Sequence, residues 1–164
     1  AIAFIDDINQ RIHASEKTIR RFSADNADVK RLKTIPGVGE FFARLIAAEI
    51  DDVTRFRSTK KLAAYAGLVP STYASGGKCW NGRLIKTGNK WLRWAFVEAA
   101  VPAMRAEPAL KFDYEHLKVT KGTNRAKVVI ARKLLTIAYQ VLRDQRDYEC
   151  RDALERRSNL SRLS

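Results

Sequence analysis

Apolar residues recur at alternating spacings of three and four near the start of the chain, with charged residues between them. This pattern predicts an amphipathic helix within residues 1–27, with its apolar positions on one seam. The seam fits two arrangements: the end of a coiled coil paired with another helix, or a single helix packed on its own domain. Its members are Ile5, Ile8, Ile12, Ile19 and Phe22.

Shorter helical patterns follow, separated by turn residues. Residues 28–50 predict two short helices around a Pro-Gly turn, and Ser58 is placed to cap a third helix. Glycine, serine and proline then interrupt the pattern over residues 67–88, which predicts one long loop. Alternating apolar residues allow a short β-hairpin within that loop. A loop this long in a compact domain is usually functional.

Three more helices are predicted beyond the loop, over about 89–105, 108–118 and 124–143. Pro102 either kinks the first of them or ends it early. The pattern as a whole predicts an all-α fold in which a helical bundle carries one glycine-rich loop and follows a coiled-coil-like helix. We expect the main domain to cover 28–147 and a loose tail to cover 148–164.

Charge gives the first indication of a partner. Lysine and arginine total 31 against 18 aspartates and glutamates, a formal net charge of +13. An excess this large favours a polyanion such as nucleic acid over a merely solvated basic surface. The cysteines Cys79 and Cys150 form no CxxC motif, and neither histidine has ligand spacing, so we expect no metal site. The apolar runs are too short to cross a membrane, and a cytoplasmic location is expected.

The turn within residues 28–50 is the first candidate site. Its proline ends one helix, and its glycines permit a tight turn that leaves backbone N–H groups open at the start of the next helix. This arrangement resembles a helix-hairpin-helix, a motif that binds DNA phosphates; the alternative is an ordinary turn between helices. We expect Gly37→Val to weaken duplex binding and leave the helices intact. The residues expected to contact DNA are Lys33, Pro36, Gly37, Val38 and Gly39.

The long loop contains the second candidate site. Ser75 is followed by two glycines and a lysine, and glycines let a backbone approach a ligand closely. A serine among cations suits attack on a phosphodiester, because the cations offset the developing charge. The alternative is a phosphate-binding loop in which the serine is only a turn residue. The residues expected to contact DNA here are Gly76, Gly77, Lys78, Lys86, Asn89 and Arg93.

Several separated motifs add a family resemblance. They read A-G-L-x-P at 66–70, S-G-G-K at 75–78, I-K-x-G-N at 85–89, L-R at 92–93, R-A-K at 125–127 and A-R-K-L-L at 131–135. Over roughly residues 28–143 the chain resembles the C-terminal domain of the DEDD-type insertion-sequence transposases. These are serine-containing, bridge-RNA-guided recombinases related to the Piv invertases.

The resemblance implies that Ser75 is the nucleophile, with Ser71 a weaker candidate. It implies an N-terminal RuvC-like domain whose acidic residues hold Mg²⁺, joined through a coiled coil in which this chain begins. No metal ligand carries over to this chain, and Glu49, Asp51 and Asp52 are interpreted as solvated helix-end charges. The implied partners are DNA, a guide RNA and further copies of the chain through residues 1–27.

The sequence therefore predicts part of a transposase that binds DNA and presents a serine to a site completed elsewhere. Such a fragment is expected to be inactive alone. Two alternatives stay open: a non-catalytic helix-hairpin-helix DNA-binding module, and the remnant of an inactive transposon.

Overall fold

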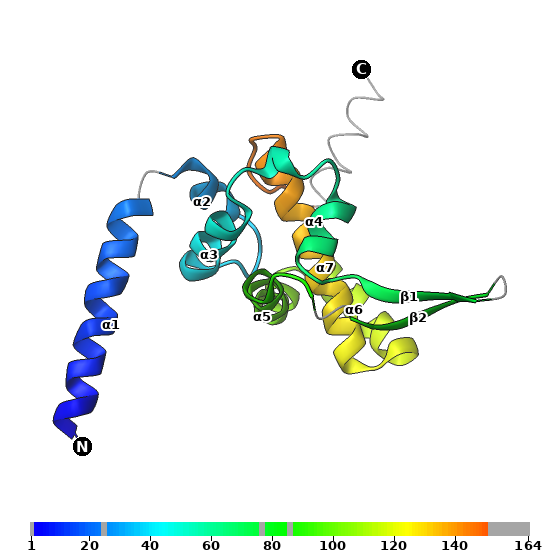
Figure 1. Cartoon of the computed structure of the whole chain (residues 1–164), viewed down its shortest axis with the longest axis horizontal. Coiled ribbons are helices and arrows are strands. Elements are labelled where there is room, and N and C mark those ends of the chain that lie inside the picture. Colours follow the sequence, from blue (N-terminus) through cyan, green and yellow to red (C-terminus); the bar gives the residue numbers. More distant parts are fainter. Residues whose placement is uncertain (1, 24–25, 76–77, 85–86, 151–164) are drawn as a thin grey trace.

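The computed structural model describes residues 2–23, 26–75, 78–84 and 87–150 (Figure 1). Within these residues the chain forms seven α-helices, one 3₁₀ helix and one two-stranded antiparallel sheet. The predicted helical fold is confirmed, and a β-hairpin interrupts it. The elements are α1 (Ile2–Ser23), α2 (Ala27–Leu32), α3 (Glu40–Ile50), η1 (Val53–Arg55), α4 (Thr59–Tyr65), β1 (Pro70–Ser75), β2 (Lys78–Leu84), α5 (Lys90–Ala106), α6 (Pro108–Lys121) and α7 (Thr123–Arg143).

Helix α7 lies at the centre of the helical body, which comprises α2–α7. It packs against α2, α4, α5 and α6. Its buried face includes Leu134 and Leu135, and Phe96 of α5 enters the same core. Each such side chain stabilises the fold by roughly 1.5–3 kcal/mol when fully buried. Tyr139 adds a buried hydrogen bond, donating its hydroxyl to the Phe56 carbonyl at 2.9 Å.

Helix α5 crosses α7 and supports much of the rest of the body. Asn89 caps its start by accepting hydrogen bonds from the N–H groups of Trp91 and Leu92. The helix continues through Pro102 to Ala106, so of the two alternatives for this proline the early end is excluded. Pro102 has no N–H for the Glu98 carbonyl, and both residues lie on the exposed side of the helix, where water can satisfy that carbonyl.

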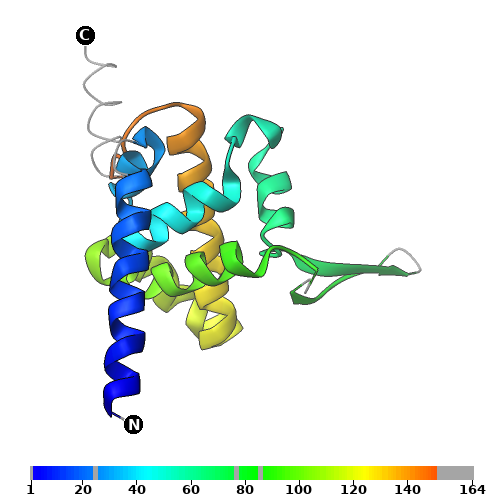
Figure 2. The same ribbon diagram turned by 60° about the vertical axis from the view of Figure 1, so that its left-hand side comes forward.

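The glycine-rich loop predicted over 67–88 is largely a hairpin. β1 and β2 pair antiparallel, with Tyr73 opposite Trp80 and Ser75 opposite Lys78, and a bulge lies between Pro70 and Thr72. The hairpin projects well beyond the helical body in both views (Figures 1 and 2). Its far end therefore lies away from the body's hydrophobic core.

Helix α1 stands apart from the helical body (Figure 1). Ile2, Phe4 and Ile5 are each more than half exposed, and Ile8 and Ile12 are exposed as well. The expectation of an amphipathic helix is met, and none of the described residues covers its apolar seam at Ile5, Ile8 and Ile12. The side chains of Ile19 and Phe22 lie outside the described set.

The segment after α7 returns to the body. The Tyr148 backbone N–H donates to the Thr34 hydroxyl at 2.8 Å, and the Tyr148 hydroxyl donates to the Glu107 carboxylate at 2.5 Å. The first residues of the expected tail are thus held against α2 and α6. Residues 151–164, the rest of that tail, lie outside the described residues.

Candidate nucleic-acid interface

The turn between α2 and α3 is set by hydrogen bonds and by one glycine. The Val38 N–H donates to the Ile35 carbonyl at 3.1 Å, and Pro36 and Gly37 occupy the two central positions. Gly37 has φ +79°, which a side chain disfavours. Proline followed by a residue of positive φ is the signature of a type II turn. The predicted turn is present, with its glycine where the backbone requires one.

Gly37 faces inward rather than toward solvent. A Cβ at this position would come 2.4 Å from the Ala99 carbonyl oxygen and 2.5 Å from the Ala103 nitrogen, both on α5. Val38 is also buried, at 4% exposure. The expectation that Gly37→Val would spare the helices is therefore wrong, because any side chain there displaces α5.

Gly39 has the opposite surroundings. It is the N-cap of α3, and no heavy atom of the described residues lies within 4 Å of the Cβ it lacks. Among these residues no side chain caps the helix either, so the N–H groups of the first turn of α3 are open. A hollow lined by residues 37–42 and Pro102 adjoins them. The end of α3 can therefore receive an anion, because the backbone dipole is positive there.

A carboxylate that sequence reasoning missed stands beside this helix end. Glu40 pairs with Lys33 and with Arg44. Hydrogen bonds from Lys33, which has the larger effect, and from Arg44 lower the pKa of Glu40 to about 2. Lys33, expected as a phosphate contact, is thus already paired. The sequence did offer a signal for Glu40, because acidic residues are enriched in the first turn of helices.

The serine loop is placed by its backbone. Ser75 ends β1 and is paired with Lys78 at the start of β2, at the far end of the hairpin. Gly76, Gly77 and Lys86 lie outside the described residues, as do the side chains at positions 70–84. The hairpin end and the α2–α3 turn lie on opposite sides of the body in both views (Figures 1 and 2). The structure does not bring the two candidate sites together.

Asn89 is occupied within the protein. Besides capping α5, its side-chain amide donates to the Glu49 carboxylate at 2.5 Å and to the Tyr65 hydroxyl at 3.3 Å. The interpretation of Glu49 as a solvated helix-end charge is therefore wrong, since it joins α3 to the base of the hairpin. Arg93, also expected at the site, is half-buried one turn into α5.

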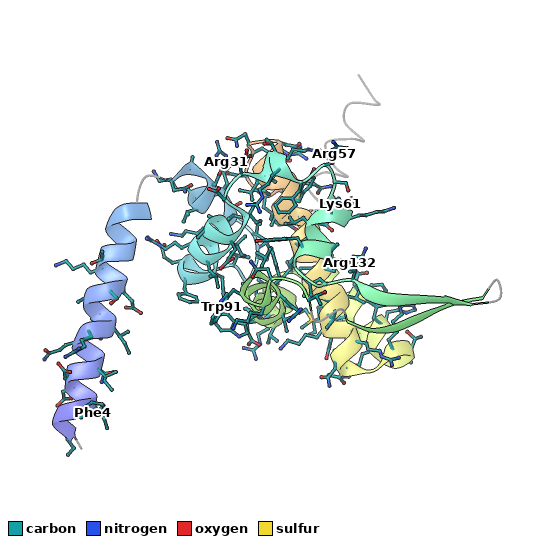
Figure 3. The ribbon with its side chains drawn as sticks, viewed as in Figure 1. Phe4, Arg31, Arg57, Lys61, Trp91 and Arg132 are labelled. Atoms are coloured by element: carbon teal, nitrogen blue, oxygen red, sulfur yellow. The ribbon has the colours of Figure 1, made fainter. Side chains whose placement is uncertain are left out.

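Further cations lie on the side of the body that carries the hairpin. Figure 3 shows Arg57 near the start of α4, Lys61 on α4 and Arg132 on α7. Arg57 and Lys61 are exposed and Arg132 is half-buried. Within the part of the chain that the structure describes, none of the three belongs to an ion pair. Only Arg132 had a sequence signal, the A-R-K-L-L motif.

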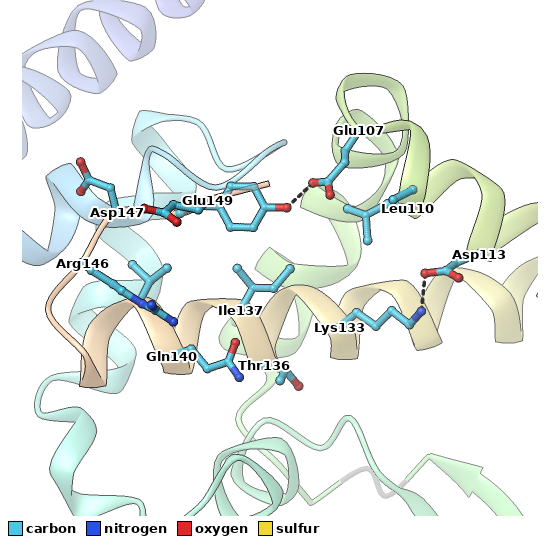
Figure 4. Close-up of a pocket in the computed structure, with 13 residues that line it drawn as sticks. Glu107, Leu110, Asp113, Lys133, Thr136, Ile137, Gln140, Arg146, Asp147 and Glu149 are labelled. Atoms are coloured by element: carbon cyan, nitrogen blue, oxygen red, sulfur yellow. Dashed lines mark hydrogen bonds and ion pairs between the residues drawn. The ribbon is translucent and has the colours of Figure 1, made fainter. Parts of the chain in front are cut away.

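A second hollow, of about 350 Å³, lies between α6, α7 and residues 146–149 (Figure 4). Tyr148 and Glu107 close one side, and an ion pair between Lys133 and Asp113 closes another. Charges of both signs line it, so it offers no clear preference for an anion. In the described ranges no three His, Cys, Asp or Glu residues gather as metal ligands. None of the helices described there has the length and apolar character needed to cross a membrane.

Comparison with known proteins places this arrangement in a family. Residues 29–115 match the family model described as the Transposase IS116/IS110/IS902 family. The transposase for insertion sequence element IS1111A of Coxiella burnetii is 31% identical over 140 residues, covering 82% of this chain and 38% of that protein. The pilin gene-inverting protein of Moraxella bovis is 34% identical over 150 residues, covering 89% of this chain and 46% of that protein.

The chain thus spans less than half the length of these relatives. The family match covers the α2–α3 turn, the hairpin, α5 and the first half of α6. On the extent of that match and the identity to these relatives, the chain belongs to the Transposase IS116/IS110/IS902 family.

Proposed function

We propose that this chain is the DNA-binding and serine-bearing C-terminal part of an insertion-sequence transposase. Its relatives are named as transposases and as a protein that inverts a pilin gene, and all of these names imply action on DNA. The net charge of +13 favours the same polyanion. The observation that carries the proposal is the uncapped N-terminus of α3 at Gly39, open to solvent and fixed by a turn pressed against α5.

The N-terminus of α3 would bind a phosphate as helix-hairpin-helix motifs do. Its open N–H groups donate to phosphate oxygens, and the absence of a side chain at Gly39 permits close approach. Glu40 would otherwise repel the phosphate, and its pairing with Lys33 and Arg44 offsets that charge. Such contacts position a duplex without reading its sequence.

Gly39→Asp tests this grip. Its backbone, at φ −76°, suits any residue, and an aspartate at an N-cap stabilises the helix. We expect an unchanged or raised melting temperature together with weaker binding to unrelated duplexes. The slope of log K against log salt should fall by about 0.9 for one lost phosphate contact.

Asn26→Asp is the matched control, because Asn26 caps α2 and the substitution adds the same charge at another helix start. Binding that is unaffected by Gly39→Asp, or equally weakened by Asn26→Asp, would remove the α3 end from the interface.

Catalysis would come from Ser75 when the chain is joined to a RuvC-like domain. The Ser75 hydroxyl oxygen bonds to phosphorus, the bond to the leaving deoxyribose oxygen breaks, and that oxygen takes a proton. The base that accepts the serine proton would come from the other domain. The position of Ser75 at the far end of a projecting hairpin supports this reading, since a partner domain can reach it there.

Mg²⁺, implied by the family resemblance, does not fit the described residues, which hold no group of three ligands. The residues of this chain therefore act without Mg²⁺ in this proposal, and we expect the isolated chain not to cleave DNA. In a full-length protein, Ser75→Ala should abolish covalent protein–DNA adducts and keep DNA affinity, whereas Ser71→Ala should keep both. Adducts that persist in Ser75→Ala, or that vanish only in Ser71→Ala, would place the nucleophile elsewhere and leave this loop as a phosphate-binding element. A full-length parent that forms no adduct would favour the second candidate, a non-catalytic DNA-binding module or transposon remnant.

The exposed seam of α1 would join copies of the protein. An apolar stripe at heptad spacing favours cover by another helix, and in the part of the chain that the structure describes nothing covers Ile5, Ile8 and Ile12. Light scattering should show self-association that Ile8→Asp with Ile12→Asp removes; a parent that is monomeric at high concentration would contradict it. A guide RNA is a further proposed partner, and action on bacterial DNA agrees with the cytoplasmic location expected from the sequence.

A further inference from the structure

Four aromatic side chains form a continuous surface where α3 begins and α5 begins. We call this set, Phe41, Phe42, Trp91 and Trp94, the aromatic patch. Trp94 meets Phe42 at 5.4 Å and Phe41 at 6.1 Å between ring centroids, and it meets Trp91 at 6.3 Å. These three contacts are edge-on, with ring planes 71–79° apart, and Phe41 meets Phe42 in the same way at 70°. The rings thus hold one another in place across two helices.

The aromatic patch is open to solvent. Phe41 is 61% exposed, Trp91 52% and Trp94 42%, whereas Phe96, on the opposite side of α5, is fully buried. Figure 3 shows Trp91 pointing outward from the body. Phe42 packs partly against the core, whereas the exposed area of Phe41, Trp91 and Trp94 contributes nothing to burial. Contiguous exposed aromatics on a monomer mark a binding surface.

The surroundings of the aromatic patch suit an anionic ligand. The Lys90 ammonium lies 5.0 Å from the centroid of the Trp91 ring. At the other edge, Phe41 and Phe42 line the hollow beside the open N-terminus of α3. Glu40, at that edge, is paired with two cations, and Glu98, one turn after Trp94 on α5, pairs with Lys127 at 3.8 Å. Ring faces are thus flanked by a cation and by a phosphate-binding backbone.

We propose that the aromatic patch stacks unpaired bases of a DNA strand, whose phosphates contact Lys90 and the start of α3. Aromatic rings beside cations are how proteins hold single strands without reading sequence. Duplex DNA cannot use the surface in this way, because its bases already stack on each other. This inference rests on the proposed DNA-binding function, and assigns to the same face a preference for separated strands.

The experiment compares two ligands of equal length and charge: an oligothymidylate and a strand that carries abasic sites throughout. We expect the parent chain to bind the oligothymidylate at least about fivefold more tightly, since stacking adds to phosphate contact. Trp91→Ala and Phe41→Ala should each reduce this ratio severalfold, and Trp91→Phe should retain most of it. Binding to a duplex should stay within about twofold, because phosphates dominate there.

Phe112→Ala is the matched control, since Phe112 is 74% exposed on α6, outside the aromatic patch. Equal binding of the base-carrying and abasic strands would overturn the inference, as would an equal loss in Phe112→Ala. The two variants lie on different helices, so misfolding of one leaves the other to decide. An oligouridylate bound more than about fivefold more tightly than the DNA strand would overturn the assignment to DNA. Failure of the proposed function differs from all of these, because duplex binding would then be absent too.

Discussion

Helices α1 and α7 are nearly equal in length, at 22 and 21 residues, and both have an apolar stripe. Their surroundings differ completely. On α7 the stripe is buried by α2, α4, α5 and α6, and on α1 every described side chain is exposed. The comparison teaches that helical periodicity identifies a face that requires a partner. It does not say whether that partner lies in the same chain.

The largest expected effect tests that contrast directly. Leu134→Ala empties a fully buried site on α7 and should lower the free energy of unfolding by roughly 2–5 kcal/mol. Ile8→Ala on α1 should change it by less than about 0.5 kcal/mol, because Ile8 is exposed. Urea unfolding at low protein concentration provides both values. Similar losses at the two positions would show that α1 belongs to the packed body.

Gly37 and Gly122 both have a φ of +79°, so substituting each of them compares the cost of a packing clash with the cost of backbone strain. We expect Gly37→Ala to cost roughly 2–4 kcal/mol, since its Cβ collides with α5 in addition to the strained backbone. Gly122→Ala, on the link before α7, meets none of the described atoms within 4 Å, and its cost of about 1–3 kcal/mol comes from backbone strain alone, because φ +79° with ψ 161° is nearly confined to glycine. Thermal unfolding measures both. A cost for Gly37→Ala of only about 1 kcal/mol, the strain of its backbone alone, would mean that the α2–α3 turn is not held against α5.

Asn89 provides a smaller test of how the hairpin joins the body. Asn89→Ala removes the cap of α5 and the link to Glu49, and should cost about 1–2 kcal/mol. Ser58→Ala is the comparison, because Ser58 precedes α4 without making a side-chain cap hydrogen bond, and we expect almost no change. Denaturant unfolding of both variants decides, and a larger loss from Ser58→Ala would contradict the assigned contacts.

The smallest effect concerns Glu40 and acid. Hydrogen bonds from Lys33 and then Arg44 lower its pKa from 4.5 to about 2. A depressed pKa means stability that is fully present above pH 4.5 and lost as pH falls toward 2. The unfolding free energy of Glu40→Gln should therefore lie below that of the parent at pH 6 and approach it near pH 2. The effect is small because the pair is solvent-exposed, and NMR titration of Glu40 near pH 4.5 would contradict it.

The helical pattern could be predicted because each helix has its own periodicity and punctuation. The α2–α3 turn was equally local, since Pro36 and Gly37 encode it. The packing of Gly37 against α5 could not be predicted from the sequence around it, because it depends on Ala99 and Ala103, more than 60 positions along the chain. The Glu49–Asn89 bond spans 40 positions and leaves no pattern in either segment.

The hairpin was predictable only as a possibility. Its strands are short and polar, so alternation of apolar residues is a weak signal there. The aromatic patch was missed for a related reason: Trp91 and Phe41 look like core residues in the sequence, and only packing shows which aromatic positions face water. Ser75 stays a prediction, since its side chain lies outside what the structure describes.

The two chain segments that flank the hairpin are in close backbone contact. Gly88 rests so closely on Gly67 that a Cβ there would lie 2.3 Å from the Gly67 nitrogen, and the next N–H, of Asn89, donates to the Tyr65 carbonyl at 2.7 Å. The end of α4 and the start of α5 are therefore held directly against each other where the hairpin leaves the body. The length of the hairpin can therefore change independently of these contacts. Two more residues in each strand would lengthen it by about 7 Å and leave the contacts between Gly67 and Gly88 unchanged.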